Sequence, residues 1–235
     1  MKIDILTIFP KMFESPFNES LIGKAKEKGL LNINAIDIRS FSKDKRKKVD
    51  DKPFGGGAGM VLKPEPVYAA LKSLTARKKR GQTRRVIYMS PQGSPLNNSI
   101  VKDLSKYSHL VILCGHYEGV DERIMRFIDD EISIGDYVLT GGEIPAMVLV
   151  DAVARMIKGV VKEEASVKND SFYNGLLDYP HYTRPSVFKK MQVPEVLLSG
   201  DHKKIDEWRQ KQSYERTKKR RPDLIKQKLK IESGK

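Results

Sequence analysis

The residues that suggest chemistry are glycines, tyrosines and carboxylates gathered in three short segments. The longest segment runs from Ile134 to Glu143, and the others are Ser90-Pro91-Gln92-Gly93 and Gly115-His116-Tyr117-Glu118-Gly119. Glycine lets a backbone approach a ligand closely, so amides and carbonyls of these segments could contact the edge of a base while a tyrosine covers its face. Each segment alone is more typical of an ordinary tight turn. Together they predict one shared ligand pocket.

The chain lacks the common nucleotide-binding and metal-binding patterns. It contains neither G-x-G-x-x-G nor G-x-x-x-x-G-K-[ST], which excludes a standard dinucleotide or triphosphate loop. The single cysteine, Cys114, excludes an internal disulfide and is expected to be a buried strand residue without a redox role. The four histidines show no ligand spacing, so we assign no metal site: His109, His116, His181 and His202.

The elements that must position these segments alternate along the first two thirds of the chain. Apolar periodicity predicts strands at 3–8, 31–38, 86–89, 109–113 and 131–134, and helices at 19–28, 66–74, 98–106, 121–128 and 145–157. This alternation favours an α/β fold with a mainly parallel sheet. Ligands of such sheets bind beyond the carboxyl ends of the strands, where the three segments are expected to lie.

The last third of the chain differs in character. Residues 161–171 are polar without a clear period, which predicts a linker or mobile lid. Beyond it we expect a small, basic, helical domain with helices near 194–200 and 201–218.

Positive charge is abundant and clustered. The net charge is +14, and residues 201–235 contribute half of it, with 13 Lys or Arg against 6 Asp or Glu. Further clusters lie at Lys43–Lys48 and Arg77–Arg85. This clustering favours binding of a polyanion, usually an RNA or DNA backbone, over the alternative of solvated surface charge. Apolar runs too short to span a bilayer and an amino terminus unlike a signal peptide predict a cytoplasmic protein.

Four longer motifs carry a family resemblance. They are Ser90–Gly93, Cys114–Arg123, Ser133–Pro145 and Leu176–Pro185. With them the chain resembles the bacterial tRNA (guanine-N1)-methyltransferases of the TrmD family, from Ile5–Pro10 through Phe54–Gly57 to Arg220-Arg221-Pro222. The resemblance implies a sheet with a deep trefoil knot at about residues 86–145, followed by an all-helical carboxyl-terminal domain. Its domains would be a cofactor-binding domain at 1–160, a flexible lid at 161–174 and a tRNA-binding domain at 175–235.

The resemblance also implies the reaction and its partners. The family is homodimeric and uses S-adenosyl-L-methionine to methylate N1 of guanosine 37 in tRNA, beside the anticodon, when a guanosine precedes it. The implied partner is therefore tRNA, with neither DNA nor a membrane involved. Magnesium is expected to assist the family's reaction, although no residue pattern here defines its site.

Carried onto this chain, the resemblance assigns two groups of site residues. Asp170 becomes the general base and Arg155 the group that polarises guanine. Many family members carry arginine where His116 stands. The cofactor-binding residues would be Pro91, Gly115, Tyr117, Glu118, Gly119, Ile134, Gly135, Asp136, Tyr137, Val138, Leu139, Gly141 and Gly142.

These roles compete with simpler interpretations of the same residues. From the sequence alone, Asp170 is more typical of a helix cap and Arg155 of a surface pair with Asp151 four residues earlier. Likewise, Tyr117 and Tyr137 are typical of core aromatics. The alternative functions are a knotted ribose 2′-O-methyltransferase and a non-catalytic RNA-binding protein.

Overall fold

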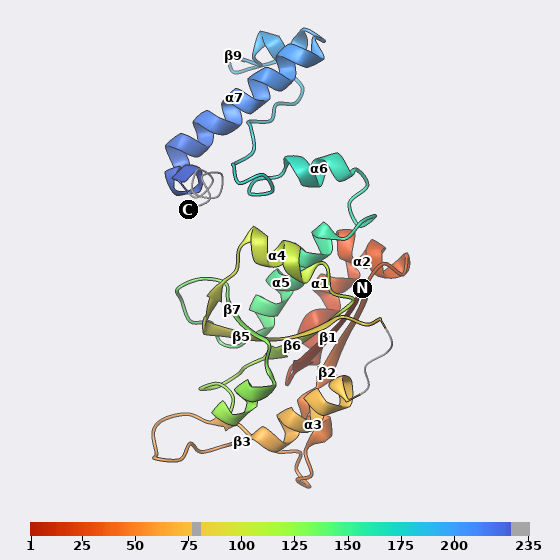
Figure 1. The fold of residues 1–235 in the computed structure, drawn as a ribbon, viewed down its shortest axis with the longest axis vertical. Helices are drawn as coiled ribbons and strands as arrows, with labels where there is room; N and C mark the ends of the chain where they lie inside the picture. The colour runs from red at the N-terminus through yellow and green to blue at the C-terminus, as the bar shows by residue number, and fades with distance from the viewer. Residues whose placement is uncertain (77–80, 227–235) are drawn as a thin grey trace. The chain divides into compact units, whose positions relative to one another are not determined.

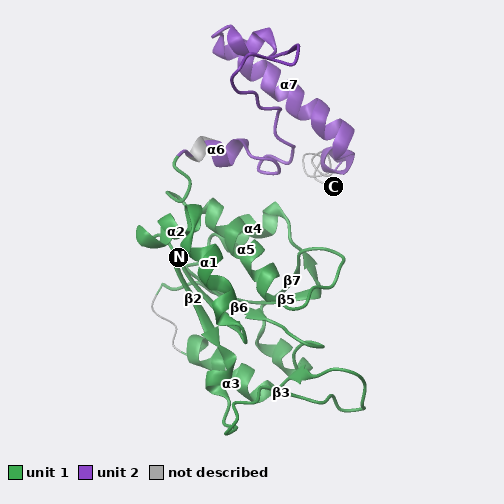
Figure 2. Cartoon of the chain, turned by 180° about the vertical axis from the view of Figure 1, so that it is seen from behind, with its two compact units in different colours: residues 1–162 green, residues 163–235 purple. Residues whose placement is uncertain are grey.

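The computed structural model describes residues 1–76 and 81–226 (Figure 1). The chain forms two compact units, Met1–Lys162 and Glu163–Lys235 (Figure 2). Part of the basic cluster Arg77–Arg85 and the end of the expected 175–235 domain lie outside the described residues. Within the described ranges, none of the helices combines the length and apolar character needed to cross a membrane.

A five-stranded parallel sheet forms the centre of the first unit. Its strand order is β2-β1-β6-β5-β7, and all four pairings are parallel. The strands are β1 (Lys2–Thr7), β2 (Asn32–Asp37), β5 (Arg84–Pro95), β6 (His109–Cys114) and β7 (Asp130–Ser133). A separate antiparallel pair joins β3 (Asp50–Asp51) to β4 (Val61–Leu62). The predicted mainly parallel α/β architecture is therefore confirmed.

Helices cover both faces of this sheet and bury two hydrophobic clusters. Alternate strand residues point to opposite faces, so Ile87 and Met89 join one cluster while Val86 and Tyr88 join the other. The first cluster packs under α1, α2, α4 and α5, and the second packs under α3 on the opposite side (Figure 1). These helices are α1 (Glu14–Asn18), α2 (Ser20–Glu27), α3 (Pro64–Thr75), α4 (Asn98–Leu104) and α5 (Glu143–Met156).

The segment Ser90–Gly93 departs from the expected strand end. It lies inside β5, which continues to Pro95, and Met89 and Ser94 both pair with Ile132 of β7. The four residues between them therefore loop out of the ladder as an irregularity. An isolated bulge of this kind leaves no apolar periodicity in the sequence, which is why the strand was expected to end at residue 89.

Three short elements of the first unit are 3-10 turns. They are η1 (Pro10–Phe13), η2 (Ile38–Phe41) and η3 (Glu122–Phe127). The last replaces the α-helix expected at 121–128, so that prediction was wrong in type. Asp121 accepts a hydrogen bond from the backbone N–H of Arg123 and so caps the turn at its first residue. 3-10 geometry is common in connecting pieces, although six residues is long for such a turn.

The second unit contains more than helices. The expected linker 161–174 includes α6 (Glu164–Asn169), and a two-stranded hairpin joins β8 (Val187–Phe188) to β9 (Met191–Gln192). The all-helical prediction for this part was therefore wrong. The expected helices correspond to η4 (Glu195–Leu198) and α7 (His202–Arg220). The fully buried Thr217 fixes α7 to the preceding chain, because its hydroxyl accepts a hydrogen bond from the N–H of Leu177 at 2.9 Å.

A buried charge cluster lies toward the amino ends of the central strands. The Asp4 carboxylate is 1% exposed and accepts hydrogen bonds from Lys2 at 2.6 Å and Asn34 at 2.9 Å. It also lies 2.8 Å from Nε2 of the buried His109. Burial alone would raise the pKa of Asp4, but the bonds from His109, Lys2 and Asn34 outweigh burial and hold it below its ordinary value.

Replacing Asp4 should therefore destabilise the first unit. We expect Asp4→Asn to lower the free energy of unfolding by about 3 kcal/mol at pH 7, because His109 and Lys2 lose a buried charged partner. The folded pKa lies below the unfolded value of about 3.9, so this contribution is complete above that pH and is lost as pH falls through the folded pKa. Urea unfolding of both proteins across this range measures the difference.

The matched control is Asp103→Asn on α4. This substitution removes an exposed carboxylate that lies 3.2 Å from Nζ of Lys106. It should change stability by less than about 0.5 kcal/mol. Equal losses in the two variants would contradict a special role for the buried cluster.

Candidate functional site

The three glycine-bearing segments converge on one cavity in the first unit. The cavity holds about 220 Å³ and lies beyond the carboxyl ends of β6 and β7, beside the irregular part of β5. Pro91 comes from β5, residues 115–119 follow β6, and residues 134–142 follow β7. Parallel strands bring these loops to the same edge of the sheet, as the general rule for α/β sheets predicts.

Most of the residues assigned to cofactor binding line this cavity. Asp136 is the exception, since it is absent from the lining. The lining residues that the sequence assignment missed are Tyr88, Met89, Ser90, Gln92, His116, Ile132, Ser133, Thr140 and Pro145. Several of these were expected as strand or loop residues, but strand alternation does not indicate which of them border a cavity. The assigned residues in the lining are Pro91, Gly115, Tyr117, Glu118, Gly119, Ile134, Gly135, Tyr137, Val138, Leu139, Gly141 and Gly142.

Backbone contacts hold the loops after β6 and β7 together. The N–H of Gly142 donates to the carbonyl of Gly115 at 2.8 Å, and His116 forms an isolated antiparallel bridge with Gly141. A Cβ on Gly142 would lie 2.8 Å from Cα of Cys114 and 2.9 Å from the nitrogen of Gly115. Only glycine permits this approach, so this wall of the cavity requires glycine at position 142.

Aromatic side chains stand at the cavity with their faces accessible. Tyr117 is 47% exposed and Tyr137 is 55% exposed, so the core-aromatic interpretation was wrong for both. Tyr117 also has a positive φ of 60°, which costs a non-glycine residue on the order of 1–3 kcal/mol. Accessible rings beside exposed backbone would suit a planar heteroaromatic ligand.

Two buried groups near the cavity remain protonated at neutral pH. Burial, together with the charges of Glu131 and Glu122, raises the pKa of Tyr88 to about 12, so its hydroxyl stays available as a donor. Burial, and secondarily the charge of Glu143, raises the pKa of Cys114 well above its ordinary value. A protonated, fully enclosed thiol is a poor nucleophile.

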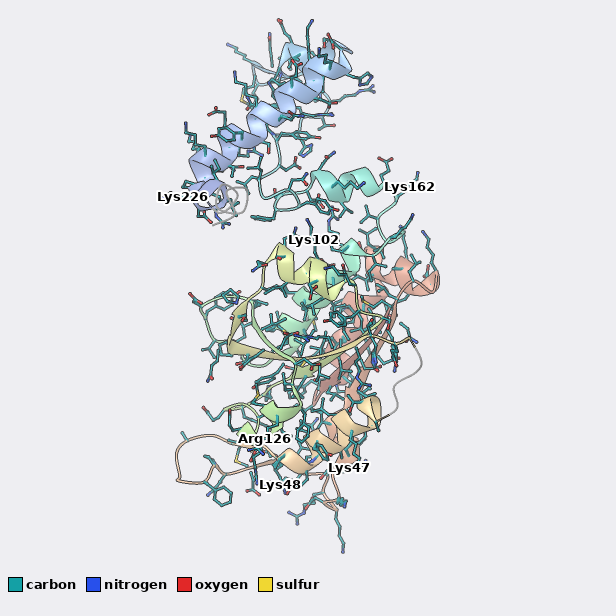
Figure 3. The ribbon with its side chains drawn as sticks, viewed as in Figure 1. Lys47, Lys48, Lys102, Arg126, Lys162 and Lys226 are labelled. Carbon is teal, nitrogen blue, oxygen red and sulfur yellow. The ribbon has the colours of Figure 1, made fainter. Side chains whose placement is uncertain are left out.

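A basic groove adjoins the cavity. It is lined by Arg39, the 44–50 loop and Tyr117, and Tyr117 also lines the cavity. The 44–50 loop carries Lys45, Arg46, Lys47 and Lys48 against two aspartates. Figure 3 labels Lys47 and Lys48 on this loop, with Arg126 of η3 at the same end of the first unit. The groove therefore places positive charge beside the aromatic rim of the cavity.

The two catalytic candidates lie in different units, and neither lines the cavity. Arg155 is half-buried in the last turn of α5 in the first unit. Asp170 is half-buried in the second unit, where it directly follows α6. Asp170 thus lies at the end of a helix and not at its start, which excludes the interpretation that it is an amino-terminal cap.

Comparison with known proteins identifies the family. A family model described as tRNA (Guanine-1)-methyltransferase TrmD matches residues 1–227. The chain belongs to this methyltransferase family. The family membership that the sequence motifs predicted is therefore confirmed.

Similar proteins support the same family over nearly their full length. A tRNA (guanine-N(1)-)-methyltransferase of Endomicrobium trichonymphae is 69% identical over 232 residues, which cover 96% of this chain and 100% of the relative. Proteins of the same name from Desulforamulus reducens and Ruminiclostridium cellulolyticum are 57% and 55% identical. Their alignments cover 96% of this chain and 89% and 96% of the relatives. A methyltransferase family implies a methyl donor.

The close approach at Gly142 can be tested with the methyl donor that the resemblance implies. Gly142→Ala should weaken binding of S-adenosylmethionine at least ten-fold, because the added Cβ forces the two loops apart at a cost of about 1–3 kcal/mol. Isothermal titration calorimetry measures the affinity.

The matched control is Gly200→Ala in the second unit. Gly200 has a positive φ of 73° and no atom within 4 Å of an added Cβ, so the substitution strains the backbone without a collision. It should cost about 1–2 kcal/mol of stability and leave binding unchanged. Equal affinities of the two variants would show that the loop contact does not shape the binding site.

Proposed function

We propose that this chain transfers a methyl group from S-adenosylmethionine to N1 of guanosine 37 in tRNA, next to the anticodon, in the cytoplasm. The observation that carries the proposal is the family match over residues 1–227 together with relatives named tRNA (guanine-N(1)-)-methyltransferase along nearly their whole length. The convergence of three glycine-bearing loops on one cavity supports it independently.

The cavity fits the chemistry of the donor. Exposed backbone of the Gly115–Gly119 loop and the 134–142 loop would contact the adenine and ribose, while Tyr117, Tyr137 and Leu139 supply apolar faces. The irregular segment of β5 would close the remaining side through Pro91. When bound, the donor supplies a methyl group made electrophilic by its sulfonium, so no metal is needed for the transfer itself. The loops that make these contacts fall within residues 86–145, which we propose to form the family's trefoil knot.

Asp170 acts as the general base in this proposal. N1 of guanine carries a proton at neutral pH and is a poor nucleophile until that proton is removed. A carboxylate within hydrogen-bond reach accepts it, and such catalysis contributes about 10²–10⁴-fold to the rate. The position of Asp170 after α6, inside the segment 161–174, fits a base carried by a closing lid.

Arg155 stabilises the charge that develops on the guanine. Loss of the N1 proton moves negative charge toward O6, and a guanidinium stabilises that charge when its donors are already oriented. Arg155 lies in the last turn of α5, the helix that begins directly after the cavity-lining Gly142.

Two basic regions would hold the tRNA. The basic groove beside Tyr117 would contact phosphates near the target base, and Arg216–Arg221 at the end of α7 would contact phosphates elsewhere. Such contacts position the RNA without specifying its sequence, and their strength falls steeply with salt. Asp170 of one subunit would act on cofactor held by its partner in a homodimer.

Methyl-transfer assays with labelled donor test the reaction. The wild-type chain should label a tRNA transcript with guanosine 37 on N1 and leave the adenosine 37 transcript unlabelled. Asp170→Ala should lower kcat by about 10²–10⁴-fold and Arg155→Ala by about 10²–10³-fold. Asp103→Asn, on the surface of α4, is the control and should retain full activity.

The alternatives predict different labelling. A ribose 2′-O-methyltransferase would place the label on a ribose, and a non-catalytic RNA-binding protein would bind the transcript without labelling it. Either result would overturn the proposed function.

Subunit mixing tests the shared site. At a donor concentration well below the weakened dissociation constant of Gly142→Ala, the Asp170→Ala and Gly142→Ala homodimers should each have low activity, because each homodimer carries the same impaired component in both of its sites. Each mixed dimer contains one site with both components intact and one site with both impaired. Co-refolded heterodimers should therefore show up to about half of the activity of the wild-type dimer. If co-refolded, purified heterodimers remain inactive, base and cofactor come from the same subunit.

A further inference from the structure

A buried carboxylate lies directly behind the cavity wall. Glu143 is the first residue of α5 and is 2% exposed. Its Oε1 accepts a hydrogen bond from the hydroxyl of Thr7 at 2.7 Å, and that hydroxyl accepts one from the N–H of Phe9 at 2.8 Å. The end of β1 therefore fixes this carboxylate in place, although Glu143 itself does not line the cavity.

The second carboxylate oxygen of Glu143 faces a histidine that does line the cavity. Nδ1 of His116 lies 3.9 Å from Oε2 and is buried without a hydrogen-bond partner among the described residues. The rings of Phe9 and Tyr117 contact the imidazole edge-on, with centroids at 5.0 Å and 4.7 Å. Aromatic rings therefore flank the imidazole on two sides and restrict its orientation.

Gly141 makes this encounter sterically feasible. A Cβ at this position would collide with Oε2 of Glu143 and lie 2.6 Å from Nδ1 of His116. The backbone of Gly141 also pairs with that of His116. The side chains of His116 and Glu143 therefore meet across a residue that has no side chain.

The location of one proton decides whether this encounter is attractive. An unprotonated Nδ1 is an acceptor, and a buried acceptor facing a carboxylate oxygen is doubly unfavourable. A proton on Nδ1 turns the repulsion into an electrostatic attraction toward Oε2, across 3.9 Å and without a hydrogen bond. We propose that Glu143 is a positioning residue that keeps a proton on Nδ1 of His116 and so fixes the imidazole, and the loop that carries it, as part of the cavity wall.

This arrangement determines what His116 offers to a ligand. With the proton on Nδ1, a neutral imidazole has its lone pair on Nε2, so the ring contributes an acceptor to a cavity whose other polar groups are mostly backbone. Without the Glu143 carboxylate, the proton would lie on Nε2 and the lone pair on Nδ1. The consequence for cofactor binding rests on the proposed function, whereas the location of the proton does not.

The tautomer can be measured directly in the full-length chain. Long-range ¹H–¹⁵N spectra of histidine-labelled protein distinguish the two neutral forms, and His116→Gln identifies the signals of residue 116. We expect the Nδ1–H form in the wild type. In Glu143→Gln the new amide can donate to Nδ1, so we expect the Nε2–H form. An Nε2–H form in the wild type, or an Nδ1–H form retained in Glu143→Gln, would overturn the proposal.

Cofactor affinity separates positioning from general stability. Glu143→Gln and His116→Gln should each weaken S-adenosylmethionine binding about ten-fold. Each should also raise the KM for S-adenosylmethionine while kcat changes less than two-fold. The double variant should bind no more weakly than His116→Gln alone, because Glu143 acts through His116. Losses that multiply in the double variant would instead show independent effects.

The matched control is Glu65→Gln. Glu65 is an exposed acidic residue in the first turn of α3, so it repeats the loss of negative charge at a helix amino terminus without the histidine contact. Its affinity for S-adenosylmethionine should equal that of the wild type, and a comparable loss would assign the effect of Glu143 to helix charge. If the wild type itself fails to bind S-adenosylmethionine, the proposed function fails, while the histidine spectra still decide where the proton lies.

Discussion

The first unit depends on the close approach of two loops at the carboxyl edge of its sheet. The bond from Gly142 N–H to the Gly115 carbonyl joins the ends of β6 and β7 at a separation that excludes any side chain at residue 142. The helix α5 starts at the next residue and carries Arg155 in its last turn. One contact between main chains therefore fixes the cavity wall, the start of α5 and the direction in which that helix leads away from the cavity.

Buried polar groups occupy opposite ends of the same sheet and serve different purposes. Toward the amino ends, Asp4 is fully satisfied by Lys2, Asn34 and His109, which makes that cluster a structural anchor. At the carboxyl end, Glu143 is held by Thr7 but meets His116 at a distance longer than a hydrogen bond. A partly satisfied polar group beside a cavity has freedom to respond to a ligand, whereas a fully satisfied one resists change.

The parts of the fold that followed from the sequence are those with strong periodicity. The six residues of β6 are all buried, and the apolar run Leu110–Cys114 after His109 is typical of a central parallel strand covered on both faces. The long helix α5 and the basic helix α7 were likewise expected near their observed bounds. The elements that differed were short: the bulge in β5, the turn η3, α6 and the β8–β9 hairpin. Two of these elements rest on a few local contacts, the cap of η3 by Asp121 and the pairing of Val187 with Gln192, and such contacts leave no apolar periodicity in the sequence.

The sequence by itself determined the family, the α/β class, the basic character and the three loops that meet at the cavity. Those features reside in residue types and local spacing, whereas the need for glycine at 141 and 142 comes from the neighbours that an added Cβ would meet. Only the tertiary structure decided that Asp136 lies outside the cavity lining, that Tyr88 belongs to it, and that Glu143 lies behind it against Thr7 of β1. The physical reason is that burial and hydrogen-bond partners arise between residues up to 136 positions apart, and they exist only once the sheet has assembled.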